Sequence, residues 1–240
     1  MFLHEIPEIA AGLDHLIATV PEFAGADRSS FRWRRRDPSF AGLLEMILGQ
    51  QVSGAAAAAM WAKLQIALPE PKPGEFLLLE DDVLASCGFS RQKARYGRAL
   101  AEALISGSLD LEALHEAPDE EVITALTALP GIGLWSAQVY LMFALGRPDI
   151  WPAGDLGIML GVQYLRDLPD RPKPATVINA AEAWRPYRSA ASLLVWNYYS
   201  SVAAARRQAA KAAALGAKAA AKNVKKPERA AGPARSRKSR

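Results

Sequence analysis

Hydrophobic residues recur every three or four positions through most of this chain, which is the spacing of amphipathic helices. The pattern predicts helices over residues 5–18, 37–48, 53–68, 80–86, 90–105 and 118–126. Further helices are expected from the end of segment 129–135 through residue 145, after Asp155, and over 175–184 and 189–201. No segment alternates between apolar and polar residues as a half-buried strand would, so we expect an all-α fold.

The charge of the chain is unevenly distributed. Residues 202–240 hold twelve Lys and Arg and one acid, whereas residues 1–201 hold 17 basic and 24 acidic residues. The net charges are therefore +11 and −7, which sum to the overall +4. A tail of this kind favours a polyanion such as DNA or RNA, although a solubilising extension would have the same composition. We expect an Ala/Lys helix in the tail and disorder after Asn223.

Several classes of protein are excluded by composition. Cys87 is the single cysteine, so the chain has no internal disulfide and no four-cysteine iron–sulfur or zinc site. The three histidines have no metal-ligand spacing, and there is no phosphate-binding glycine loop. The N-terminus does not resemble a secretion signal and no apolar run is long enough to cross a membrane, so we expect a cytoplasmic protein.

A glycine-containing corner joins two of the predicted helices at Leu129-Pro-Gly-Ile-Gly-Leu-Trp135. Gly131 and Gly133 permit a tight turn and leave backbone N–H groups uncovered at the start of the second helix. Such a corner binds a DNA phosphate without a basic side chain. We expect Ile132 to point inward and anchor the turn. The alternative is an ordinary corner between two packed helices.

Asp155 follows Pro152-Ala-Gly154 at the start of a predicted helix, about twenty residues after the corner. An aspartate at this position is commonly just an N-cap. A carboxylate beside the anomeric carbon of a nucleotide would also stabilise the positive charge that develops when an N-glycosidic bond breaks. One residue can fill both roles.

Four segments together resemble the helix-hairpin-helix DNA glycosylases, and within them the bacterial 3-methyladenine DNA glycosylase II type. The first is Ile47-Leu-Gly-Gln-Gln-Val-Ser53, and the second is Cys87-Gly-Phe-Ser-Arg-Gln-Lys-Ala-Arg95. The third is the corner with Asp155 after it, and the fourth is Trp184-Arg-Pro-Tyr-Arg-Ser189 with Trp196. The resemblance spans about residues 37–201. It implies a helical domain over residues 1–201, with two lobes and a cleft, followed by the basic tail 202–240.

The resemblance assigns expected roles to individual residues. Asp155 is the catalytic carboxylate, and the expected base pocket contains Trp135, Trp196 and Tyr187. Gln51 lies where the family inserts a side chain into the gap left by a flipped nucleotide. The expected DNA-contacting residues are Gln50, Gln51, Ser53, Pro130, Gly131, Ile132 and Gly133. No cofactor or metal is implied, although the hairpin carbonyls are a candidate site for a monovalent cation.

Departures from the family pattern narrow the expected activity. Relatives that also nick the strand carry a lysine where this chain has Trp135, and the role matched to Lys93 is structural. We therefore expect a compact, monomeric, monofunctional glycosylase, without an N-terminal β domain, that releases alkylated purines from double-stranded DNA in a bacterial nucleoid. The alternatives are another lesion class, a non-catalytic DNA-binding module, and an RNA-binding protein supported by charge alone.

Overall fold

The computed structural model describes the backbone of residues 1–224, and side chains through residue 213 except that of residue 210. Residues Met1–Tyr199 form one compact unit, and the chain from Ser200 onward belongs to a second. The division lies two residues before the boundary predicted from composition. Helix α12 (Arg188–Val224) runs from the first unit into the second. The disorder expected beyond it concerns residues outside the described part.

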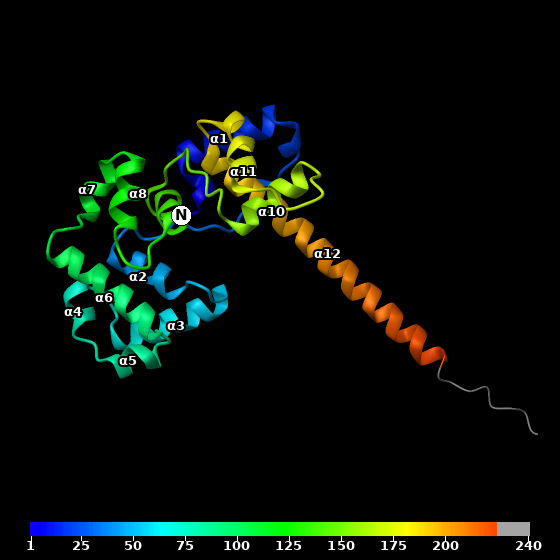
Figure 1. Cartoon of the computed structure of the whole chain (residues 1–240). Coiled ribbons are helices and arrows are strands. Elements are labelled where there is room, and N and C mark those ends of the chain that lie inside the picture. The colour runs from blue at the N-terminus through cyan, green and yellow to red at the C-terminus, as the bar shows by residue number, and fades with distance from the viewer. Residues whose placement is uncertain (225–240) are drawn as a thin grey trace, which may run out of the picture. The chain divides into compact units, whose positions relative to one another are not determined.

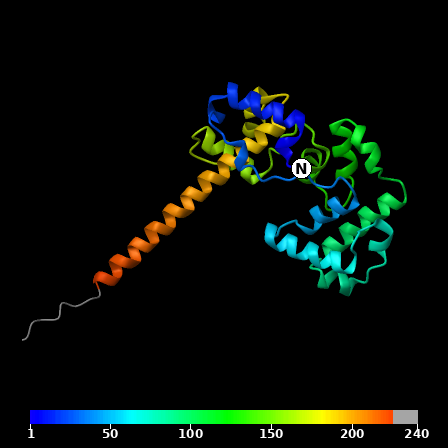
Figure 2. The ribbon, with the colours of Figure 1, turned by 180° about the vertical axis from the view of Figure 1, so that it is seen from behind.

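The first unit is helical, as the hydrophobic periodicity predicts. Within the described residues no strand occurs, and β-type pairing is limited to one bridge between Phe2 and Arg34. One group of helices contains α2 (Phe40–Leu48), α3 (Gly54–Ala67), α4 (Pro73–Leu77), α5 (Asp81–Ser86), α6 (Arg91–Ile105), α7 (Leu111–Glu116) and α8 (Asp119–Thr127). A second group contains α1 (Pro7–Thr19), α10 (Leu156–Leu165), α11 (Pro174–Ala180) and the first turns of α12. These two groups are seen in Figures 1 and 2.

Helix α9 (Leu134–Tyr140) links the two groups and continues as a π-helical turn, Leu141–Leu145. Its residues are largely buried, and Tyr140 is completely so. The Tyr140 hydroxyl donates a hydrogen bond of 2.7 Å to the carbonyl of Pro38, and burial raises the pKa of Tyr140 to about 12. This helix begins at the glycine corner, so the corner is anchored directly in the core.

Two details differ from the sequence-based expectation. Helix α2 begins at Phe40 after the N-cap Ser39, and Asp37 instead accepts a hydrogen bond of 2.9 Å from the Ser39 N–H. Asp37 therefore organises the turn before the helix. Helices α4 and α7, of five and six residues, were not predicted; helices this short show little of a period, although the equally short α5 was predicted. In the described part of the chain, no helix has both the length and the apolarity needed to cross a membrane.

Candidate active site

The glycine corner between α8 and α9 is a tight turn in which the two glycines have different conformations. Gly131 adopts a left-handed φ of +86°, and a Cβ there would come within 2.1 Å of the Tyr96 ring. Gly133 is the N-cap of α9 with an ordinary φ of −92°, so only one of the two glycines needs its conformational freedom. Ile132 is 5% exposed and anchors the turn, as its apolar side chain predicts. Pro130 and Gly133 lie at the surface.

The turn between α2 and α3 is joined to this hairpin. The Gln50 side-chain amide donates a 2.8 Å hydrogen bond to the carbonyl of Gly131. Gln51 is exposed and has a φ of +58°, an unusual conformation for a residue other than glycine. Ser53 caps α3 by accepting a hydrogen bond from the Ala56 N–H. Gln50 therefore fixes the hairpin from within, while Gln51 is exposed, as are Val52 and Ser53 after it.

Asp155 is held between the two tryptophans that the sequence singled out. Its Oδ1 accepts a 2.8 Å hydrogen bond from Trp196 Nε1, and its Oδ2 accepts a 2.9 Å bond from Trp135 Nε1. Oδ1 also accepts from the Ile158 N–H at 2.9 Å, which makes Asp155 the N-cap of α10. The side chain is half-buried. Both oxygens are thus fixed in place, although cleft solvent still reaches the carboxylate.

The Trp196 indole is braced from behind by other aromatic rings. The rings of Trp33 and Phe143 lie 6.2 and 5.9 Å from it, measured between centroids. The Arg36 guanidinium lies over Phe143, 5.7 Å from the ring centre, and the Arg36 N–H donates to the Phe143 carbonyl at 2.8 Å. The segment before α2 therefore supports the wall that orients Asp155.

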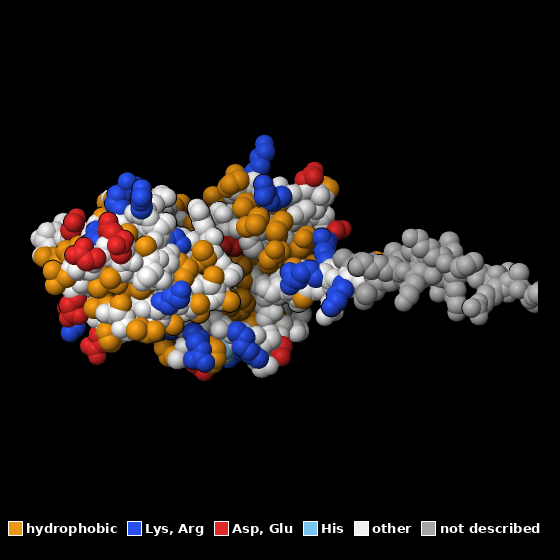
Figure 3. Space-filling view, turned by 90° about the horizontal axis from the view of Figure 1, so that it is seen from below, with side chains coloured by type: hydrophobic (Ala, Val, Ile, Leu, Met, Phe, Trp, Pro, Cys, Tyr) orange, Lys and Arg blue, Asp and Glu red, His pale blue; other side chains and the backbone are white. Residues whose placement is uncertain are grey.

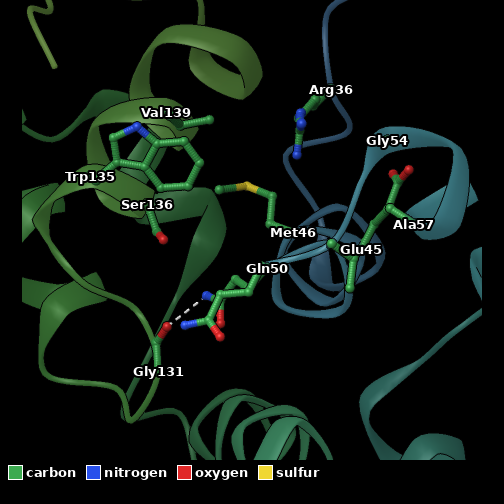
Figure 4. Close-up of a pocket in the computed structure, with 13 residues that line it drawn as sticks. Arg36, Glu45, Met46, Gln50, Gly54, Ala57, Gly131, Trp135, Ser136 and Val139 are labelled. Carbon is green, nitrogen blue, oxygen red and sulfur yellow. Dashed lines mark hydrogen bonds between the residues drawn. The ribbon is translucent and has the colours of Figure 1, made fainter. Parts of the chain in front are cut away.

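A cavity of about 550 Å³ opens beside Trp135, within the usual size range of ligand pockets. Figure 4 shows the Trp135 ring on one side of it, Gln50 and Gly131 at one end, and Met46 between them. The other residues that line it are Arg36, Glu45, Gly49, Gln51, Val52, Gly54, Ala57, Ser136 and Val139. The Trp135 indole both lines the cavity and contacts Asp155, so a single side chain connects the cavity with the carboxylate.

Exposed apolar side chains surround this region. Val52, Leu134, Trp135 and Leu156 are between 39% and 55% exposed, and they lie in the turn before α3 or at the starts of α9 and α10. On the face shown in Figure 3, hydrophobic patches alternate with scattered Lys and Arg, and acidic side chains gather towards the left end. Exposed apolar groups near a cavity are typical of a surface that binds another molecule.

Two further expectations concern Tyr187 and Lys93. Tyr187 does not join the group around Asp155, because its ring packs on α1, 5.0 Å from the His15 ring and against Gly12. The structure therefore gives Tyr187 a packing role in place of the expected pocket role. Lys93 Nζ donates a 2.6 Å bond to the Leu48 carbonyl at the end of α2, in line with its expected structural role. Burial lowers the pKa of Lys93.

The described part of the chain contains no group of three or more His, Cys, Asp or Glu side chains placed to hold a metal ion. The carbonyls of Leu129 and Gly131 already accept hydrogen bonds, from the Ile132 N–H and the Gln50 side chain. The monovalent cation site at the hairpin carbonyls stays a prediction.

Comparison with known proteins places this geometry in a family. The model of the HhH-GPD superfamily base excision DNA repair proteins matches residues 44–186. The chain belongs to this superfamily. DNA-3-methyladenine glycosylase 1 of Schizosaccharomyces pombe is 31% identical over 190 residues, covering 78% of this chain and 83% of that protein. DNA-3-methyladenine glycosylase 2 of Escherichia coli is 28% identical over 183 residues, covering 72% of this chain and 62% of that protein.

A solved structure supports the same assignment. The S. pombe 3-methyladenine DNA glycosylase in complex with abasic DNA superposes with a TM-score of 0.68 at 29% identity. The match covers 78% of this chain and 95% of that one. The HhH-GPD chain described here is a DNA glycosylase of base excision repair, and DNA is its binding partner.

Sequence reasoning did not identify the cavity residues Arg36, Glu45, Met46 and Val139 or the bracing residues Trp33 and Phe143. The arginines around Trp33 were a visible signal, since Arg32, Arg34, Arg35 and Arg36 interrupt an otherwise acidic domain. The contacts of Phe143 and Glu45 depend on tertiary packing and leave no trace in the local pattern.

Proposed function

We propose that this glycosylase hydrolyses the N-glycosidic bond of alkylated purines, of the 3-methyladenine and 7-methylguanine type, in double-stranded DNA. The observation that carries the proposal is the Asp155 carboxylate, fixed by the two indole N–H groups beside a cavity. The substrate class is taken from the relatives, which are named as 3-methyladenine glycosylases.

The hairpin supplies the grip on DNA. The uncovered N–H groups at the start of α9 donate hydrogen bonds to a phosphate of the strand, which explains how a domain with a net charge of −7 over residues 1–201 binds a polyanion. Gln51 enters the gap left by the flipped nucleotide, since it is an exposed residue directly after Gln50, which ties the turn to the hairpin. The extruded base then enters the cavity beside Trp135.

The chemistry follows from the charge on the substrate. An N7-methylated guanine or N3-methylated adenine carries a positive charge in DNA, so its bond to the sugar is already weakened and the base leaves without being protonated. Asp155 stabilises the positive charge that builds on the sugar and orients the attacking water. Trp135 occupies the position of the lysine found in strand-nicking relatives, so release by hydrolysis leaves an intact abasic strand.

Incubation with methylated duplex DNA, followed by chromatographic identification of the released bases, tests this proposal. We expect free 3-methyladenine and 7-methylguanine to appear together with abasic sites in an uncut strand. Release of neither base, under conditions in which the protein binds the duplex, would overturn the assignment of substrate class.

A further inference from the structure

Two charged side chains in the cavity have no part in the mechanism above. Arg36 and Glu45 both line the cavity next to Trp135 (Figure 4). Glu45 lies on the solvent-accessible side of α2 and is exposed, although the α2 residues on either side of it, Leu44 and Met46, are buried. Within the described residues, the Glu45 carboxylate takes part in no hydrogen bond and no ion pair.

Arg36 is already engaged. The Arg36 guanidinium lies over the Phe143 ring. Partial burial lowers the pKa of Arg36, although part of the side chain is open to solvent. Glu45 lines the same cavity, and its negative charge acts in the opposite direction, raising the pKa of Arg36. Glu45 therefore offsets the Arg36 charge in the cavity, and its oxygens are free to accept hydrogen bonds from a bound molecule.

The charges matter because alkylated and undamaged purines differ in charge more than in shape. A guanine methylated at N7 is a cation, whereas guanine itself and the deaminated purine hypoxanthine are neutral. A carboxylate at the wall of a pocket favours a cation over a neutral molecule, and an unbalanced guanidinium would repel the cation; because Glu45 is exposed, solvent screens part of both effects. The N1–H and amino edge of 7-methylguanine can donate hydrogen bonds to a carboxylate, but guanine has the same edge, so it is the positive charge that separates the two bases.

We propose that Glu45 is a specificity-determining residue that favours positively charged purines in the cavity over neutral ones. The inference rests on the proposed function, because it requires the flipped base to enter the cavity beside Trp135. Under this proposal, the Glu45 charge and the Trp135 ring both contribute to discrimination between damaged and normal bases.

The test uses the full chain with the Asp155→Asn substitution, so that bound substrate is not consumed. Affinity is measured for two duplexes that differ only in carrying 7-methylguanine or guanine at one position. The parent should prefer the 7-methylguanine duplex. Adding Glu45→Gln, which keeps size and removes the charge, should reduce this preference about tenfold, and Glu45→Lys should reduce it further. Glu102→Gln changes another exposed Glu, on helix α6, that does not line the cavity; it is the matched control and should leave the ratio unchanged.

A second readout uses the chain with Asp155 intact. Single-turnover release of 7-methylguanine should fall about tenfold in Glu45→Gln, while release of hypoxanthine should stay within about twofold of its starting rate. An equal loss on both bases, an unchanged preference, or no preference in the parent would overturn the role of Glu45. Failure of the proposed function would look different, since the unsubstituted protein would then release no methylated base at all.

Discussion

Replacing Trp196 by Phe isolates what the indole N–H contributes to the position of Asp155. The aromatic face that packs against Trp33 and Phe143 is largely kept, while the 2.8 Å bond to Oδ1 is removed. The carboxylate keeps its bonds from Trp135 and from the Ile158 N–H. The substitution therefore loosens one oxygen without removing the group.

The size of the effect follows from the strength of that bond. A hydrogen bond to a charged group contributes about 1.5–3 kcal/mol, which corresponds to about 10- to 150-fold in rate if all of it is realised in the transition state. Because two other donors still hold the carboxylate, we expect a loss of about 10- to 50-fold. Trp135→Phe should cost less, since the Trp135 side chain is 46% exposed and water can replace its N–H.

Single-turnover release of 7-methylguanine from methylated duplex measures this loss, with affinity for an abasic duplex as the reference for binding. Trp61→Phe is the matched control, because it makes the same change on helix α3, and its indole makes no bond to Asp155. A Trp196→Phe protein that releases the base at the starting rate would refute the view that the indole positions the carboxylate.

Two further predictions concern the hairpin and the tail. Gly131→Ala should lower the free energy of unfolding, measured by urea titration, by about 2 kcal/mol or more, because it adds a Cβ at a left-handed φ and against the Tyr96 ring. It should also weaken binding to abasic duplex. Gly133→Ala, whose Cβ meets open space, is the control and should change the free energy of unfolding by less than about 0.5 kcal/mol. Deleting residues 203–240 removes twelve basic residues and should weaken affinity for undamaged duplex. The dependence of the binding constant on salt, plotted as log K against log salt concentration, should become less steep by about 0.9 for each phosphate that the tail neutralises. An unchanged slope would show that the tail does not bind DNA.

The fold was predictable because its helices are long and periodic enough to show in the sequence. Ser90, the first residue of the predicted helix 90–105, caps α6 with its hydroxyl, which accepts a bond from the Lys93 N–H. The turn before α2 was less predictable, because Asp37 and Ser39 are both good caps and only the surrounding contacts decide between them.

The centre of the site was also visible in the sequence. Asp155 and the hairpin glycines carry local signals, namely a cap position and a turn that needs glycine. Tyr187 shows the limit of that reasoning, because it lies just before α12, nine residues before Trp196, and packs on α1 instead. Residues such as Glu45 and Phe143 come together with the site through packing between helices far apart in sequence, which no local pattern records.

The Asp155→Asn substitution tests the central claim most directly. Asn is nearly the same size and is also a good N-cap, so α10 should form and affinity for abasic duplex should survive. Without the negative charge beside the sugar, release of methylated bases should fall by at least about 1,000-fold, measured by chromatography after single-turnover incubation with methylated DNA. Release at the rate of the unsubstituted protein would contradict the account, because the carboxylate held by the two indoles would then have no part in breaking the bond.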